Sequence, residues 1–328
     1  MNMPELSGIQ RAIFGTESAS VVRDWLDDHL REQLSGAIDD ITFQTGAIGA
    51  VFGLRLADGR DVVLKALRPG GVLARQRAVV DCQNRLAAAG FGAPTVLDGP
   101  TITRGVVAVV EERLTCTSTG APHAEATRAA MAGGLARQIE LLRAVDGSAL
   151  IDGRPAWADW DSGAWPEPHD SIFDFTTQVA GYEWIDTTAE AAAKVLQTAG
   201  ALPAVIGHSD WVWQNVCVRD DQFVAGYDWD SLIYAPESAV VGLIAGSFTQ
   251  GSPEPPQEPY ADEVTAFIGD YQRVSGRQFD DHERQIAAAA ANWVRCYNAR
   301  CHLDNRERRG IEPHPGSFID QSPAERGC

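Results

Sequence analysis

The segment at residues 205–232, VIGHSDWVWQNVCVRDDQFVAGYDWDSL, constrains the fold of this chain more than any other stretch. An apolar run delivers Asp210 into a loop, and Asn215 follows five positions later. Two further apolar runs, joined by the turn-rich residues 219–222, then lead to Asp228. This pattern predicts a strand, a loop and a tight hairpin, which together place three polar side chains at strand ends.

The side chains at these three positions are those that phosphoryl transfer requires. Asp210 can receive the proton of an attacking hydroxyl, and Asn215 with Asp228 can hold magnesium against nucleotide phosphates. Taken singly, Asp210 and Asn215 would be interpreted as turn or capping residues. Their occurrence together with Asp228, thirteen positions after Asn215, favours a catalytic site.

The acidic cluster at residues 228–230 also contains Asp230. Alternate residues of a strand share a face, so Asp228 and Asp230 could both point into one site, where a divalent cation would relieve their repulsion. The alternative is a strand-exit turn with one buried and one solvated carboxylate. We assign Asp228 to magnesium and keep Asp230 as a metal or substrate candidate.

Aromatic side chains flank the predicted base. Trp211 and Trp213 could stack on a substrate ring or cation, or could pack to hold the loop rigid. We expect His208 to hydrogen-bond the backbone and shape the loop rather than to transfer a proton.

The first 110 residues predict an antiparallel sheet with packed helices. Strand-like runs occur at 41–43, 51–56, 61–67, 94–97 and 106–110, and helical patterns occur at 19–34 and 74–89. The turn at residues 46–49 contains Gly46 and Gly49, and Lys65 follows on the returning strand. A strand lysine in this position can reach the α- and β-phosphates of a nucleotide, with a solvated strand lysine as the alternative.

Lysine usage supports the functional interpretation. Only Lys65 and Lys194 occur among 27 basic residues, and all the others are arginine. Because the two side chains are not interchangeable, a lysine retained in an arginine-rich sequence indicates a need for an ammonium group.

The rest of the chain is predicted to be mostly helical, with helices at 124–145, 189–202, 260–274 and 280–303. A tryptophan-rich loop at 153–171 and a proline-rich insertion at 252–259 interrupt the helices. The tail after Asn305 is expected to lie on the surface or to be frayed. Trp293, Tyr297 and Arg300 fall on one helical face, either as core residues or as the lining of an acceptor pocket.

Length and charge bound the class of protein. The 328 residues suit two domains, and the net charge of −18 argues against nucleic acid and anionic membranes while permitting a cationic substrate. No apolar run reaches the ~18–20 residues of a membrane span, and the N-terminus lacks a signal-peptide pattern, so we expect a cytoplasmic protein. The six cysteines form no CxxC pair or zinc pattern, so we expect free thiols in a reducing compartment.

The sequence resembles the aminoglycoside phosphotransferase and choline kinase family. Residues 208–215, HSDWVWQN, are similar to the family's H-G-D-x-x-x-x-N loop, and residues 227–229, YDW, are similar to its I-D-W metal motif. Lys65 matches the strand lysine, residues 86–97 resemble the helix-to-strand passage, and residues 109–114 resemble the interlobe hinge.

The resemblance implies an α+β, two-lobed protein-kinase-like fold. Residues 1–112 would form a nucleotide-binding lobe with an antiparallel sheet and helices, and residues 113–328 a larger, mostly helical catalytic and acceptor-binding lobe. Asp210 would be the catalytic base, Asn215 and Asp228 would bind Mg2+, and Lys65 would bind the phosphates. The remaining implied nucleotide contacts are the turn and hinge residues Gly46, Gly49, Glu112, Arg113 and Leu114.

The implied activity is ATP- or GTP-dependent O-phosphorylation of a hydroxylated small molecule, such as an aminoglycoside, another amine-bearing antibiotic or an amino sugar. Kinases of metabolic sugars or amino alcohols, and an inactive nucleotide-binding sensor, are the alternatives, and monomer and homodimer both remain open. Three features depart from the family pattern. Ser209 replaces glycine, residues 212–214 replace His-Pro-Gly, and the helix at 74–89 offers only Asp81 as an acidic partner for Lys65.

Overall fold

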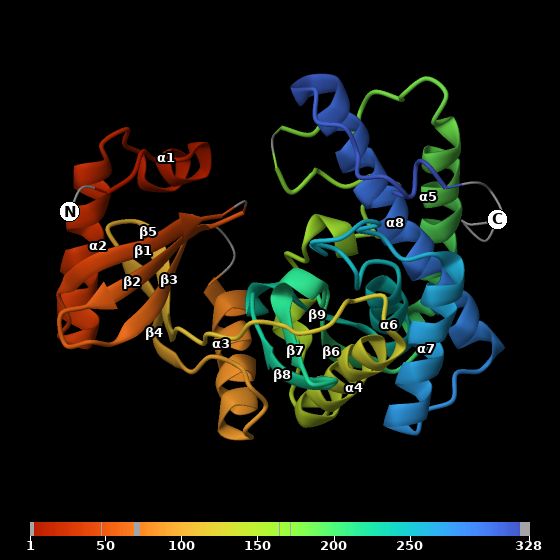
Figure 1. Ribbon diagram of the computed structural model, residues 1–328, viewed down its shortest axis with the longest axis horizontal. Helices are drawn as coiled ribbons and strands as arrows, with labels where there is room; N and C mark the ends of the chain where they lie inside the picture. Colours follow the sequence, from red (N-terminus) through yellow and green to blue (C-terminus); the bar gives the residue numbers. More distant parts are fainter. Residues whose placement is uncertain (1–2, 47, 69–72, 164, 171, 322–328) are drawn as a thin grey trace. The chain divides into compact units, whose positions relative to one another are not determined.

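The computed structural model describes residues 3–46, 48–68, 73–163, 165–170 and 172–321. The chain divides into two compact units, residues 1–115 and 116–328 (Figure 1). The α-helices are α1 (Gly8–Phe14), α2 (Ala19–Leu34), α3 (Leu73–Ala88), α4 (Glu125–Leu142), α5 (Glu183–Leu196), α6 (Glu237–Ala245), α7 (Ala261–Ser275) and α8 (Asp281–Arg309). The strands are β1 (Ile38–Thr45), β2 (Ala50–Leu56), β3 (Asp61–Leu67), β4 (Val96–Thr103), β5 (Val106–Glu112), β6 (Ala204–His208), β7 (Val216–Arg219), β8 (Gln222–Gly226) and β9 (Leu232–Pro236).

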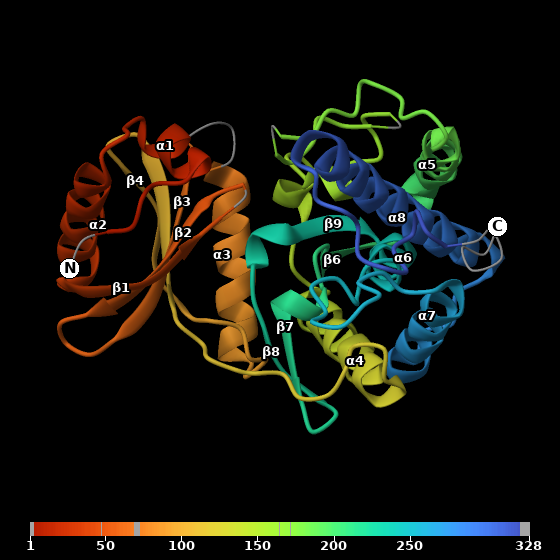
Figure 2. The same cartoon turned by 45° about the horizontal axis from the view of Figure 1, so that its top comes forward.

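The first unit is a five-stranded antiparallel sheet in the order β1-β2-β3-β5-β4. Helices α1 and α2 lie on one side of this sheet and α3 lies on the other (Figures 1 and 2). Val62, Leu64 and Ala66 alternate along β3 into the core against α2. Because strand side chains alternate between faces, Lys65 points to the opposite face of the sheet from that core.

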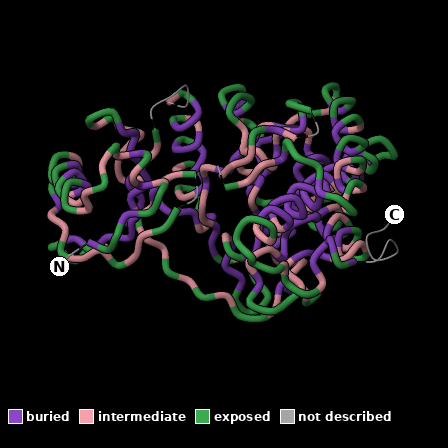
Figure 3. The backbone as a smooth tube through the Cα atoms, turned by 90° about the horizontal axis from the view of Figure 1, so that it is seen from above, coloured by how far each residue is buried: buried purple, intermediate pink, exposed green. Residues whose placement is uncertain are grey.

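The second unit is mostly helical, with two small antiparallel pairs, β6 with β9 and β7 with β8. Buried backbone is concentrated inside this unit, with exposed segments around it (Figure 3). Every residue of α6 is buried, and Gly242 lies so close to α8 that a Cβ atom would meet the Ala287 carbonyl oxygen at 2.0 Å. The expected architecture of a sheet-based first lobe and a helical second lobe is confirmed.

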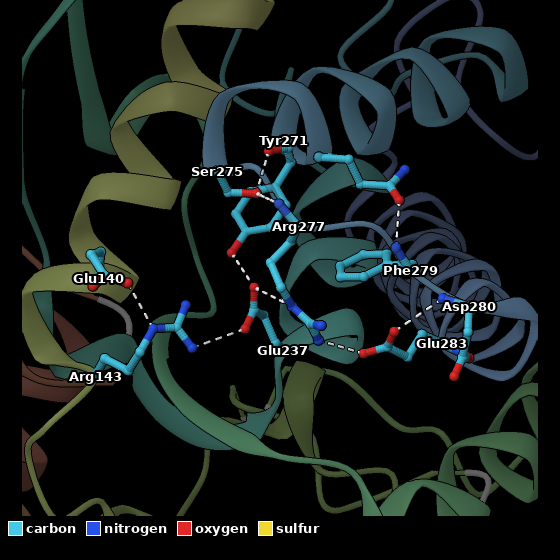
Figure 4. A network of polar contacts seen from close by, with 10 residues as sticks. Glu140, Arg143, Glu237, Tyr271, Ser275, Arg277, Phe279, Asp280 and Glu283 are labelled. Carbon is cyan, nitrogen blue, oxygen red and sulfur yellow. Dashed lines mark hydrogen bonds and ion pairs between the residues drawn. The ribbon is translucent and has the colours of Figure 1, made fainter.

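A buried glutamate links the helices of the second unit (Figure 4). Glu237 is 2% exposed and accepts hydrogen bonds from Tyr271 Oη at 2.8 Å and Arg143 Nη1 at 3.2 Å. Arg277 Nε lies 3.4 Å from the same carboxylate, and its Nη2 donates to Glu283 at 2.5 Å. The Glu237 carboxylate therefore links α6 to α7 and to the end of α4, and Arg277 extends the network to Glu283 of α8.

The end of the chain differs from the expected surface tail. Helix α8 continues to Arg309 and ends at Gly310, which adopts the left-handed conformation that stops helices. Beyond it, Ser317, Phe318 and Gln321 are buried, and Arg295 of α8 lies over the Phe318 ring at 4.1 Å. The prediction of a surface tail is therefore wrong for residues 317–321, which pack onto the helices.

The expectation of free thiols is wrong for two cysteines. Cys116 and Cys217 form a disulfide, with a Cα–Cα distance of 6.1 Å across a sequence separation of 101. The segment carrying Cys116 runs along β7, where Thr119 N donates to Val218 O at 2.8 Å. Because the disulfide joins segments that are distant in the sequence, the local spacing of cysteines could not predict it. The remaining described cysteines, Cys82, Cys296 and Cys301, are buried and form no disulfide with one another.

Among the helices that the structure describes, none has the length and apolar character needed to cross a membrane.

Candidate active site

The predicted strand, loop and hairpin are present in the second unit. Strand β6 ends at His208, opposite Leu232 of β9, and the chain then leaves the sheet through Asp210. A short 3-10 turn, Trp213–Asn215, leads into the β7–β8 hairpin. The hairpin returns the chain to the loop, because Tyr227 N donates to Asn215 O at 2.8 Å.

Asp210 and Asn215 are in direct contact. Asn215 Nδ2 donates to Asp210 Oδ2 at 2.6 Å and to the Asp210 carbonyl oxygen at 3.0 Å. The amide nitrogen is thus used to orient the carboxylate. The amide oxygen is the remaining Asn215 atom that can act as a ligand for a hard cation.

His208 shapes the loop, which confirms its expected role. Its Nδ1 accepts from Asp210 N at 3.1 Å, so its Nε2 carries the proton and donates to Tyr227 O at 2.8 Å. The buried ring lies between the indoles of Trp211 and Trp229, with centroid distances of 5.6 and 5.2 Å. The His208 imidazole therefore links the backbone amide of Asp210 to the carbonyl oxygen of Tyr227, the residue before Asp228.

Asp228 does not lie in a strand. Strand β8 ends at Gly226, and Asp228 has φ +58° immediately before the 3-10 turn Trp229–Ser231. Of the two interpretations given above, the shared strand face is therefore wrong and the strand-exit turn is present, although both carboxylates are partly exposed. A left-handed conformation is uncommon at a residue with a side chain, and such positions concentrate at functional sites.

The electrostatics of the loop favour a cation. Burial, together with the nearby Asp228 carboxylate, raises the pKa of Asp210 to about 7, against the opposing effect of the Asn215 hydrogen bond. Two carboxylates this close are costly to keep ionised without a positive charge. A divalent ion held by Asn215 and Asp228 would supply that charge, and the carboxylate and amide oxygens suit Mg2+. Among the described residues, no group of three or more His, Cys, Asp or Glu side chains forms a separate metal site.

The two loop tryptophans are packing residues in this structure. Trp211 has no exposed surface, its Nε1 donates to Met131 O at 2.9 Å, and its ring packs on Phe223. Trp213 is also buried, with 9% of its surface exposed. Direct stacking of Trp211 on a substrate is therefore contradicted, since its indole is enclosed by the protein's own core.

The aromatic face of α8 is likewise internal. Trp293, Tyr297 and Arg300 are at most 1% exposed, so the predicted direct contact with an acceptor is contradicted. Instead, they hold the tryptophan-rich loop. Trp293 Nε1 donates to Trp157 O at 2.9 Å, Tyr297 Oη contacts His169 Nδ1 at 2.8 Å, and Arg300 Nη2 donates to Thr177 O at 2.7 Å.

The loop that these residues hold reaches the catalytic segment. Trp157 Nε1 donates to Ser209 Oγ at 3.2 Å, and Ser209 Oγ donates to Ser231 O at 2.7 Å. The sequence marked Ser209 as a departure from the family glycine but gave no partner for it. The partner is 52 residues away and only the fold shows it.

In the first unit, the glycine turn and Lys65 have the expected places. Gly46 has φ +135°, and a Cβ atom there would meet Gly49 O at 1.8 Å, so the turn requires glycine. Ala47, within the same turn, lies outside the described residues. Lys65 is 7% exposed, and its Nζ lies 3.7 Å from Glu111 Oε1 of β5. Asp81 of α3 is exposed, and sequence reasoning missed Glu111 as the partner of Lys65.

The hinge residues differ in whether their backbone amides already donate a hydrogen bond. Glu112 N donates to Thr95 O at 2.9 Å and Arg113 N donates to Asp61 O at 3.1 Å, so both amides are already used. Within the described part of the chain, the Leu114 amide has no hydrogen-bond partner. Of the three predicted purine contacts, Leu114 therefore has the backbone amide that is best able to donate a hydrogen bond to a purine.

Comparisons with known proteins support the fold. No protein-family model and no curated protein sequence matches the chain. Among solved structures, amicoumacin kinase hAmiN, in complex with AMP-PNP, Ca2+ and Ami, has a TM-score of 0.58 at 11% identity, covering 92% of this chain and 93% of that chain. Macrolide 2'-phosphotransferase MphH from Brachybacterium faecium has a TM-score of 0.53 at 16% identity, covering 89% and 100%. Aminoglycoside phosphotransferase APH(4)-Ia has a TM-score of 0.53 at 15% identity, covering 88% and 93%.

The chain thus has the two-lobed, kinase-like fold of these small-molecule phosphotransferases. The similarity spans nearly the whole of both chains, so it includes both units.

Proposed function

We propose that this protein is an ATP- or GTP-dependent O-phosphotransferase that acts on a hydroxylated small molecule. The observation that carries the proposal is the arrangement of Asp210, Asn215 and Asp228 around one loop, with Asn215 bonded directly to the Asp210 carboxylate. The fold shared with three small-molecule phosphotransferases supports the same reaction class. Because fold alone does not define activity, the proposed reaction rests mainly on the geometry of the loop.

In this proposal each side chain has one task. Asp210 orients the acceptor hydroxyl and receives its proton as the general base. Asn215 and Asp228 hold Mg2+, which neutralises charge on the transferred phosphoryl group. Lys65 binds the nucleotide phosphates, with Gly46 and Gly49 in the turn that covers them, and Leu114 contacts the purine. Because the transition state is loose, positioning supplies most of the rate enhancement.

The neighbour bound to AMP-PNP and Ca2+ supports a nucleotide and a divalent cation as ligands here. We infer Mg2+ as the physiological ion because it prefers few carboxylates together with substrate phosphates.

The charge distribution supports an acceptor that carries amines. Residues 146–190 contain ten Asp and Glu residues and one arginine, which accounts for half of the chain's net charge of −18. The loop within this segment contacts Ser209 through Trp157, so the acidic segment adjoins the catalytic loop. Clustered carboxylates attract a cation and raise its local concentration.

An acceptor panel tests the proposal. The protein is incubated with Mg·ATP or Mg·GTP and pairs of acceptors that differ by one amine, for example an amino sugar and the same sugar with a hydroxyl. Phosphorylated product is detected by mass spectrometry and 31P NMR. Transfer to a member of the panel, with higher kcat/KM for the amine, is the expected result. Tight nucleotide binding with no transfer to any acceptor would instead identify a nucleotide sensor.

A further inference from the structure

Lys65 has a carboxylate partner within its own sheet. Lys65 Nζ lies 3.7 Å from Glu111 Oε1, and the two residues are 7% and 5% exposed. In the β3–β5 pairing, Lys65 is opposite Val109 and Val63 is opposite Glu111. Lys65 and Glu111 are therefore diagonal neighbours on the same face, within reach of long side chains. The register of two adjacent strands places the carboxylate beside the ammonium.

Helix α3 supplies an amide rather than an acid. Gln83 is 2% exposed, and its Nε2 donates to Glu111 Oε2 at 2.8 Å and to Pro94 O at 2.9 Å. Both partners are acceptors, so the orientation of the amide is fixed by chemistry. Glu111 thus faces Lys65 with Oε1 and accepts a hydrogen bond from Gln83 with Oε2. The acidic residue of the same helix, Asp81, is exposed.

We propose that Glu111 is the positioning residue for Lys65, that Gln83 holds its carboxylate, and that together they present the lysine ammonium to the nucleotide phosphates. The role of Lys65 in this inference rests on the proposed function. Glu111 thereby takes the place of the helix acid that the resemblance led us to seek on α3.

The arrangement has a physical consequence. The lysine and its partner belong to adjacent hydrogen-bonded strands, so the pair is set by the sheet and needs no movement of α3 to form. Preorganisation of this kind lowers the cost of ordering the side chain when the ligand binds. A compact ammonium on an unbranched stem suits the diagonal position, which agrees with lysine being retained here in an arginine-rich chain.

The first experiment measures the reactivity of Lys65 directly, without any need for turnover. The chain has two lysines, and Lys194 is exposed, so it is an internal standard for acylation by an amine-reactive ester, read by peptide mass spectrometry. A nearby carboxylate favours the protonated amine, which does not react. Glu111→Gln is therefore expected to raise the Lys65 to Lys194 labelling ratio several-fold. The exchange variant Gln83→Glu with Glu111→Gln returns a carboxylate to the cluster and is expected to lower the ratio again.

The second experiment measures nucleotide use. Glu111→Gln is expected to lower kcat/KM for the nucleotide by about tenfold and to weaken Mg·ATP binding, because one partner of a buried charge pair is lost. Gln83→Ala keeps the charge of Glu111 but removes the hydrogen bond that holds its carboxylate, so an intermediate loss of kcat/KM is expected. This variant provides the test if Glu111→Gln does not fold. Asp81→Asn removes the exposed helix acid and is the matched control, expected to be unchanged in both assays.

The pairing is overturned if folded Glu111→Gln labels Lys65 at the wild-type ratio, or if Asp81→Asn shows the change instead. Absence of nucleotide binding by the wild-type protein would refute the proposed function. In that case the labelling ratio would still decide whether Glu111 pairs with Lys65.

Discussion

Removal of the Cys116–Cys217 disulfide is expected to destabilise the second unit by about 3–5 kcal/mol. The bond closes a sequence separation of 101 residues. Loop-closure entropy for about 100 residues corresponds to about 4.7 kcal/mol, and loss of native disulfides costs roughly 2–5 kcal/mol. The hydrogen bond from Thr119 N to Val218 O is independent of the sulfur atoms, so the folded state keeps this contact and the effect falls on the unfolded chain.

Cys116→Ser is the informative variant, since Cys116 is partly exposed while Cys217 is 1% exposed and can remain as a buried thiol. Urea unfolding is followed by tryptophan fluorescence, which reports mainly on the second unit because Trp25 is the one tryptophan in residues 1–115. A dithiol reductant should lower the wild-type midpoint to that of the variant and leave the variant unchanged. Equal midpoints for the oxidised wild type and the variant would refute the reasoning, as would six reactive thiols in the denatured, unreduced protein.

Three further predictions follow from other contacts. The hydrogen bond to Glu263 raises the pKa of His123, so this bond stabilises the fold fully below the unfolded value near 6.5 and less as pH rises through the higher folded pKa; unfolding free energy measured against pH should lose this dependence in His123→Gln. Glu237→Gln should lower the free energy of thermal or urea unfolding by about 2 kcal/mol. This is less than the roughly 3–5 kcal/mol for breaking a fully buried pair, because Arg143 and Arg277 are partly exposed. The control Glu140→Gln alters an exposed partner of the same Arg143 and should change the free energy by no more than about 0.5 kcal/mol. Trp157→Phe removes the donor to Ser209 and should lower kcat about fivefold, for a hydrogen bond of about 1 kcal/mol, with nucleotide KM unchanged; an altered nucleotide KM with normal kcat would contradict a role in positioning the catalytic loop.

The sequence was sufficient to predict the parts of the site that lie close together along the chain. The loop that carries Asp210 and Asn215 and the β7–β8 hairpin follow from apolar runs and a turn within a short segment, and the structure confirms the hairpin. Lys65 was placed on its strand by the same local signals. Local patterns also predicted the sheet of the first unit and helices α4, α5, α7 and α8 of the second, but not the fully buried α6.

Long-range partners could not be predicted because nothing local encodes them. Periodicity put Trp293 and Arg300 on one face of α8, but it did not show that the tryptophan-rich loop covers that face. Glu111 became a candidate for Lys65 only once the β3–β5 register was known. The sequence left the conformation of Asp228 open for a different reason, since two acids around a tryptophan suit a strand and a strand-exit turn equally well.

The most direct test of the central claim is the kinetics of Asp210→Asn with an acceptor found in the panel. If Asp210 receives the hydroxyl proton, kcat should fall by about 10²–10⁴-fold while the Kd for Mg·nucleotide, measured by calorimetry, changes by less than about threefold. A variant that retains kcat within about threefold of wild type would show that Asp210 is not the base. The account of the loop as a phosphotransfer site would then be wrong.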